Sequence, residues 1–175
     1  MARWSRAEIE QAFQHYWRTG AVGEDWEGFA DNFSEDVIYV EHVLGTLRGR
    51  ESVRRWITKI MEEYGELYTA YEWHSVDEDA GRVIVYMQNR RDHPSGRGAI
   101  DFPGVTILGY AGDGKWRYEE DFWAVPGSQR AFKEYAEACQ RFDPEHKSRR
   151  TRLDWGNGPA WTRGAASYWE RKPAG

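Results

Sequence analysis

The sequence predicts one α+β domain, in which helices pack against a curved, mostly antiparallel sheet and enclose an aromatic-walled pocket. Residues 1–64 carry apolar side chains mainly at helical spacing, whereas residues 69–123 alternate strand-like runs with tight turns. The 175 residues also include ten Trp, ten Tyr and seven Phe. Most of these rings belong in a core, and we expect some to line a pocket or an interface.

Three helices are expected before residue 65 and a fourth near the end of the domain. The first covers 5–19 and ends at Gly20; Asp25 is the expected N-cap of a short second helix, and the third begins near Arg50. The fourth follows Pro126. Their apolar stripes are Ile9, Phe13, Tyr16 and Trp17; Trp26, Phe29, Ala30 and Phe33; Val53, Trp56, Ile57, Ile60, Met61 and Tyr64; and Phe132, Tyr135, Ala136 and Cys139.

Five strands are expected, each rich in β-branched and aromatic residues. Turn residues at 78–81 and 112–114 join two pairs of them into hairpins, and the Pro/Gly-rich stretch 93–103 is expected to be a loop. Between the first strand and the third helix, Gly45 and Gly49 bracket a turn. The predicted strands are 36–42, 69–77, 82–92, 104–111 and 115–123.

Composition restricts the partners. The net charge is −5, yet the region from Arg141 onward holds eight Lys/Arg and four Asp/Glu, so the rest of the chain is strongly acidic. An acidic body argues against nucleic acid as the main partner. Cys139 is the only cysteine, which excludes an intrachain disulfide and fits a reducing compartment. With no signal-like N-terminus and no apolar run that could span a bilayer, we expect a cytoplasmic protein without a membrane partner.

The chain is expected to divide into a domain at 1–142 and a basic, Trp-containing C-terminal tail at 143–175, where helical periodicity ends. Two interpretations of the tail stay open. It docks on the acidic body, in its own chain or in a neighbouring copy, or it is solvated and partly disordered.

One segment of the sequence resembles the nuclear-transport-factor-2-like superfamily, also called SnoaL-like. The resemblance lies in residues 33–40 (FSEDVIYV), Gly45, and residues 49–53 (GRESV), which look like the superfamily's first strand and the start of its third helix. It implies a cone-shaped curved sheet wrapped over three N-terminal helices, plus a C-terminal helix. We also expect a homodimer formed through the sheet.

A partial resemblance to limonene-epoxide-hydrolase-like enzymes implies catalytic positions. Tyr39 matches their strand tyrosine, Arg90 and Asp92 match their Arg-x-Asp, and Asp121 matches their last aspartate. Thr106-Ile107-Leu108-Gly109 is similar to the intervening strand. Glu41 stands where these enzymes have asparagine, so the match does not extend to the residue that positions water.

Alternation along strands groups these side chains. Tyr39 and Glu41 share one face, and Arg90 and Asp92 share another with Tyr86 and Gln88. If these faces are concave, the groups converge on one pocket, with Asp92 or Glu41 as the base, Asp121 as the acid and Tyr39 as a hydrogen-bond donor. The alternative is a structural Arg–Asp pair. The predicted substrate pocket comprises Tyr16, Trp17, Trp56, Tyr86 and Gln88.

The sequence thus predicts a cofactor-independent enzyme acting on a hydrophobic cyclic or aromatic molecule. Isomerisation, dehydration or lyase elimination, and epoxide hydrolysis all remain open, since each needs a positioned acid and base. The alternatives are a non-catalytic ligand-binding module and a dimeric assembly protein. No metal is expected, because the histidines lack ligand spacing and the single cysteine excludes a thiolate cluster.

Overall fold

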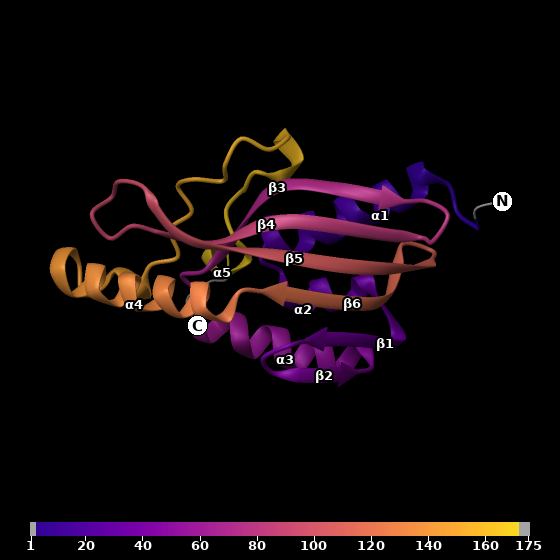
Figure 1. The fold of residues 1–175 in the computed structure, drawn as a ribbon, viewed down its shortest axis with the longest axis horizontal. Coiled ribbons are helices and arrows are strands. Elements are labelled where there is room, and N and C mark those ends of the chain that lie inside the picture. Colours follow the sequence, from indigo (N-terminus) through magenta and orange to yellow (C-terminus); the bar gives the residue numbers. More distant parts are fainter. Residues whose placement is uncertain (1–2, 172–175) are drawn as a thin grey trace.

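The computed structural model describes residues 3–171 and contains a six-stranded sheet in the order β2-β1-β6-β5-β4-β3 (Figure 1). Only the β1–β6 pair is parallel; the other neighbours are antiparallel. The predicted α+β class with a mostly antiparallel sheet is therefore confirmed. The strands are β1 Phe33–Glu41, β2 Gly45–Arg48, β3 Tyr68–Asp77, β4 Arg82–Asp92, β5 Ala99–Gly112 and β6 Lys115–Trp123.

The N-terminal helices lie behind the sheet in Figure 1 and cover its inner face, while α4 lies against β5 at one end. Buried aromatic rings from helices and strands meet between these layers, with Trp17 and Trp116 among the largest fully buried side chains. This packing accounts for a large share of the aromatic content. The helices are α1 Arg6–Trp17, α2 Trp26–Phe29, α3 Arg50–Glu63, α4 Val125–Phe142 and α5 Tyr168–Arg171; η1 Arg18–Val22 is a π-helical turn, and η2 Ala30–Asn32, η3 His146–Ser148 and η4 Ala160–Thr162 are 3₁₀ turns.

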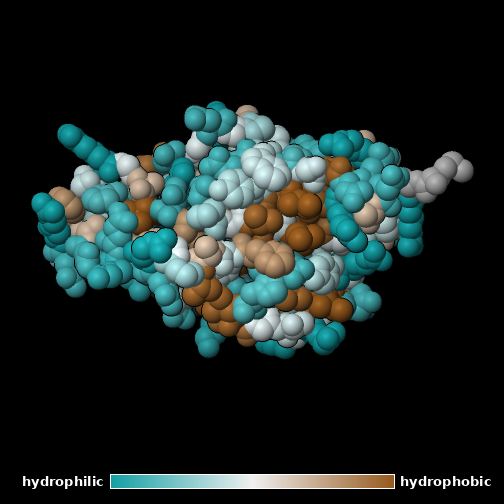
Figure 2. All heavy atoms as spheres, viewed as in Figure 1, coloured by the Kyte–Doolittle hydropathy of each residue, from teal (hydrophilic) through white to brown (hydrophobic). Residues whose placement is uncertain are grey.

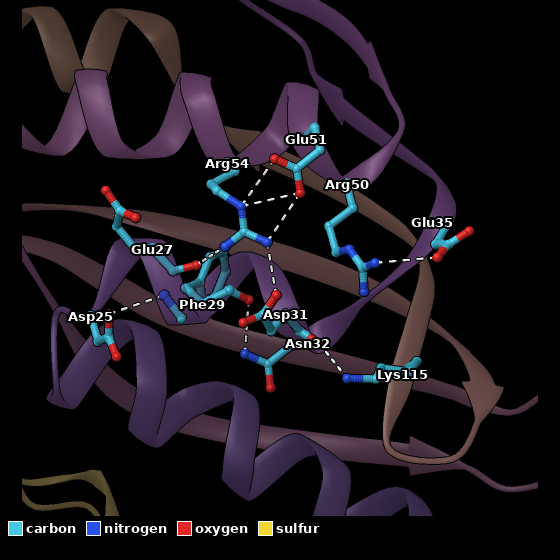
Figure 3. Close-up of polar contacts among 11 residues, drawn as sticks. Asp25, Glu27, Phe29, Asp31, Asn32, Glu35, Arg50, Glu51, Arg54 and Lys115 are labelled. Atoms are coloured by element: carbon cyan, nitrogen blue, oxygen red, sulfur yellow. Dashed lines mark hydrogen bonds and ion pairs between the residues drawn. The ribbon is translucent and has the colours of Figure 1, made fainter.

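A polar cluster joins α3 to the α2–η2 segment (Figure 3). The Arg54 guanidinium donates to the carboxylates of Asp31 and Glu51 and to the Glu27 carbonyl oxygen. The hydrogen bond from Arg54 lowers the pKa of Asp31. The two carboxylates are largely solvent-exposed, so the cluster orients α3 more than it stabilises the fold. With α3 so oriented, Trp56 packs on the Tyr39 ring, with 5.1 Å between the ring centroids.

Two strand predictions need correction. Strand β5 begins at Ala99, inside the predicted loop, and contains Pro103. This is possible because β6 pairs with β5 only from Gly104 onward, so residues 99–103 have a free edge where a missing N–H costs nothing. The short, exposed β2 replaces the turn expected between Gly45 and Gly49.

The C-terminal segment returns to the body of its own chain and lies beside the start of the edge strand β3 (Figure 1). Arg152 forms a buried ion pair with Glu24 and donates to the Gly65 carbonyl oxygen at 2.6 Å. Trp161 packs edge-on against Phe13, with 5.9 Å between ring centroids. Of the two interpretations of the tail, docking on its own chain is the one observed over 143–171.

Within residues 3–171 no helix is long and apolar enough to cross a membrane. The outer face of the sheet, which faces the viewer in Figure 2, has apolar atoms gathered near its centre. Three of its large hydrophobic side chains are exposed, namely Trp73, Ile84 and Phe122.

Candidate active site

A cavity of about 440 Å³ opens between α3, α4 and the inner face of the sheet. This volume is typical of a site for a small organic molecule. Its walls are mainly apolar and aromatic, and they include Trp26, Trp56, Met61, Phe102, Trp123 and Phe132.

Two carboxyl groups from β6 lie in this cavity. Glu119 and Asp121 are two residues apart on one strand, so both side chains point to the inner face. The Tyr16 hydroxyl donates to Glu119 Oε1 at 2.8 Å. Asp121 accepts from the Tyr39 hydroxyl at 2.5 Å and from the Thr106 hydroxyl at 2.5 Å. Side chains from α1, β1 and β5 therefore hold the two acids of β6 in position.

Burial raises the pKa of both acids. Desolvation, with a further contribution from Asp121, raises the pKa of Glu119 well above its usual range, although the hydrogen bond from Tyr16 opposes this. Desolvation also raises the pKa of Asp121, to about 6, because it outweighs the hydrogen bonds from Thr106 and Tyr39. Both carboxyl groups thus keep their proton to a higher pH than unperturbed acids do.

The two tyrosines stay neutral. Burial and the neighbouring carboxylates raise the pKa of Tyr16 and of Tyr39 well above the ordinary phenol value. Both hydroxyls are therefore donors to the acids, and neither is a base.

Glu41, at the end of β1, faces the same cavity but has a different environment. It is 4% exposed and lies opposite Asp121 in the parallel β1–β6 register. Its Oε1 accepts from the Trp123 indole N–H at 2.7 Å, and its Oε2 accepts from the backbone N–H groups of Val43 and Leu44 at 2.9 and 2.5 Å.

Several predicted site residues come together in the structure. Tyr39 and Asp121 are hydrogen-bonded, and Glu41, Tyr16 and Trp56 line the cavity with Asp121. Trp17, predicted for the pocket, lies instead in the hydrophobic core.

Arg90 and Asp92 do not converge on this cavity, contrary to the expectation. Arg90 pairs with Asp101, at 2.7 Å, and with Asp154 of the C-terminal segment, at 3.4 Å. Asp92 accepts from the Tyr68 hydroxyl at 2.8 Å and from the Leu153 N–H at 3.0 Å. The Arg-x-Asp match thus marks contacts that hold the tail, which is the structural alternative.

The sequence predicts Tyr86 and Gln88 in the pocket, but this is wrong, because they lie on the outer face of β4. The inner face carries Val83, Val85 and Met87, which are buried. Tyr86 instead stacks on Trp73, with 5.7 Å between ring centroids. The apolar alternation of β4 indicates this orientation. The resemblance at Arg90 and Asp92 implies the opposite one, with their face of the strand toward the pocket.

Sequence reasoning missed Glu119 and Thr106. A signal for Glu119 was available, because period two places it on the same face as Asp121. Thr106 lies directly opposite Asp121 in the β5–β6 register, a pairing that only the three-dimensional sheet defines.

Within residues 3–171 no group of three or more His, Cys, Asp or Glu side chains is arranged to hold a metal ion. The chemistry open to the described cavity residues is acid–base chemistry by carboxyl groups, with hydroxyl and indole donors around them.

Comparison with known proteins agrees with this fold. Residues 6–119 match the family of the SnoaL-like domain. No curated protein matches the sequence.

Three solved structures illustrate the likeness. A Jannaschia sp. CCS1 protein assigned as a SnoaL-like polyketide cyclase is 20% identical, with a TM-score of 0.55 over 75% of this chain and 96% of that chain. SalBIII, an epoxide hydrolase/cyclase-like enzyme of pyran ring formation in salinomycin, is 16% identical, with a TM-score of 0.57 over 70% and 95%. A Catenulispora acidiphila protein with a ketosteroid isomerase-like fold, in complex with trimethylamine, is 17% identical, with a TM-score of 0.52 over 69% and 88%.

At these identities the likeness establishes the fold, and it confirms the predicted cone-like architecture. The resemblance noted in residues 33–53 is confirmed by the family match, which spans well over half of the chain. The protein therefore belongs to the SnoaL-like domain family.

Proposed function

We propose that the protein is a small-molecule enzyme of the cyclase or isomerase type, which uses carboxyl acid–base catalysis on a hydrophobic cyclic or aromatic substrate. The observation that carries this proposal is the buried Glu119–Asp121 pair at an apolar cavity. Membership of the SnoaL-like family and neighbours among cyclase-like proteins support an enzyme of this general kind.

Each acid has a distinct role in this proposal. Ionised Asp121 takes a proton from the substrate or from a bound water, and protonated Glu119 gives one to a substrate oxygen. One proton is accepted and one is donated, so the total number of protons on the pair is unchanged. Tyr39 and Thr106 hold the Asp121 carboxylate in place, and Tyr16 holds Glu119.

The reaction subtype stays open within this proposal. Isomerisation and elimination begin with loss of a proton from carbon, while epoxide opening begins with activation of water. The same base serves each of them, and no cofactor is required by the proposal.

The test is a panel of cyclic ketones and epoxides incubated with the protein in D₂O. NMR follows deuterium incorporation, and mass spectrometry follows diol formation. We expect turnover of at least one compound, and Asp121→Asn should lower its rate by about 10²–10⁴-fold, the usual contribution of a positioned base.

Asp79→Asn, the same change at an exposed turn, is the matched control and should leave the rate unchanged. Equal rates in wild type and Asp121→Asn would refute the assigned base. Binding of panel compounds without any turnover would favour the ligand-binding module instead.

A further inference from the structure

We propose that Glu41 is a positioning residue that fixes both the entrance and one wall of the cavity, and so determines which ligands enter. This inference rests on the proposed function, in that it takes the cavity to be the ligand site. We define the entrance loop as residues 42–44, which connect β1 to β2.

The entrance loop lies where the cavity meets solvent. Val43 and Leu44 line the cavity and are nevertheless 48% and 60% exposed. Exposed apolar side chains at a cavity mouth are positioned to contact an apolar ligand as it enters. The geometry of this loop therefore controls the size of the opening.

Glu41 holds the entrance loop from inside. Its Oε2 accepts from two consecutive backbone N–H groups, those of Val43 and Leu44. On the outer face His42 pairs with Glu120 at 2.8 Å and packs on the Phe122 ring, with 4.6 Å between centroids. The loop is thus held on both faces of the sheet, and Glu41 supplies the inner attachment.

Glu41 also holds a wall of the cavity. Its Oε1 accepts the Trp123 indole N–H, which sets the orientation of a ring that packs on Phe102, with 5.7 Å between centroids. One carboxylate therefore couples the end of β1, the loop and the end of β6.

The geometry of the Glu41 carboxylate favours a positioning role over that of a catalytic base. Glu41 accepts three hydrogen bonds from the protein and is almost fully buried. A substrate proton would have to compete with these donors. Asp121 lies opposite in the register, and the Glu41 charge contributes to the raised pKa of Asp121.

The test compares wild type, Glu41→Gln and the matched control Glu62→Gln, which makes the same change at an exposed glutamate on α3. In Glu41→Gln only one acceptor oxygen remains in place of two, so N–H exchange measured by NMR should become about tenfold faster either at the Val43 and Leu44 N–H groups or at the Trp123 indole, the effect of losing one hydrogen bond. The neutral dye N-phenyl-1-naphthylamine should also associate faster in stopped-flow fluorescence.

A third readout separates positioning from a general loss of structure. Removing the Glu41 charge should move the Asp121 titration, followed by carboxyl ¹³C shifts, to lower pH, whereas Glu62→Gln should leave it unchanged. If Glu41→Gln unfolds, Trp123→Phe removes one donor and keeps a ring, and it should still speed dye association. Unchanged N–H exchange and unchanged dye association in these variants would overturn the inference. Because none of these measurements involves turnover, they test the role of Glu41 independently of the proposed reaction.

Discussion

At the scale of single residues, the site depends on what surrounds each carboxyl group. Glu119, Asp121 and Glu41 share a face of the sheet, yet their partners differ. Glu119 has one tyrosine donor and is 1% exposed, so desolvation dominates. Asp121 has two hydroxyl donors, which restrain the rise of its pKa. Three carboxyl groups on one face of the sheet therefore differ in their hydrogen-bond partners.

The hydroxyl of Tyr39 is predicted to tune Asp121. In Tyr39→Phe the ring packing on Trp56 is retained, but a hydrogen bond to the carboxylate is lost. Since that bond lowers the pKa of Asp121, its removal should raise this pKa above about 6. A carboxyl ¹³C titration measures the change.

Tyr118→Phe is the control for this variant, because the Tyr118 hydroxyl donates to Glu120 at 2.7 Å on the other side of the sheet. It should not move the Asp121 titration. An Asp121 midpoint that falls, or stays constant, in Tyr39→Phe would show that the hydrogen bond does not stabilise the ionised form.

At the scale of elements, the C-terminal segment contributes through buried charges. Arg152 and Glu24 are 6% and 1% exposed, and their ion pair joins the tail to the segment between η1 and α2. Arg152→Ala leaves Glu24 buried without its partner, so we predict a loss of about 3–5 kcal/mol in the free energy of unfolding, measured by chemical denaturation.

Arg149→Ala provides the comparison, because the Arg149–Asp143 pair has an exposed arginine. It should cost about 0–1 kcal/mol. Similar losses in the two variants would contradict a dominant role for the buried pair.

The elements differ in how well the sequence predicts them. The bounds of β4 and β6 follow from β-branched and aromatic runs between clear turns. The sequence predicts β5 too short, because a proline such as Pro103 is typical of a loop. A strand can contain this proline only where its edge is unpaired, and that edge is visible only in the assembled sheet. Strand β2 has no apolar alternation that could indicate it.

The sequence predicts only part of the candidate site, because strand alternation groups residues on a face but does not show which face is covered. Tyr39, Glu41 and Asp121 were grouped by strand parity and by resemblance, and the structure does bring them together. The prediction for Arg90 selects the wrong face, since a three-residue motif carries no information about which side of β4 is covered. The docked tail that binds Arg90 and Asp92 lies about 60 residues away in sequence.

At the scale of the whole molecule, the outer face of the sheet carries exposed apolar side chains, among them Trp73 and Ile84, that do not line the cavity. A shallow hollow there is lined by Ile38, Ile84 and Ile107, with Arg82, Arg117 and Glu120 around it. We propose that a second copy of the chain covers this face, as the homodimer expected from the sequence requires, because its centre is apolar and exposed.

This dimer predicts a concentration-dependent sedimentation coefficient. Ile84→Lys should weaken association by placing a charge in the apolar contact, while Leu153→Lys, at an exposed position on the tail, should not. A protein that stays monomeric at every concentration, or equal effects of the two substitutions, would exclude this interface.

The fold buries the two acids of β6, and this burial raises the pKa of both. The most direct test is a ¹³C titration of the Asp121 and Glu119 carboxyl groups, assigned with Asp121→Asn and Glu119→Gln. We predict that Asp121 titrates near pH 6 and Glu119 at a pH well above the usual range of a glutamate, so that activity rises as Asp121 ionises and falls as Glu119 does. Two carboxyl groups that both titrate at about 4, as unperturbed acids do, would contradict the account.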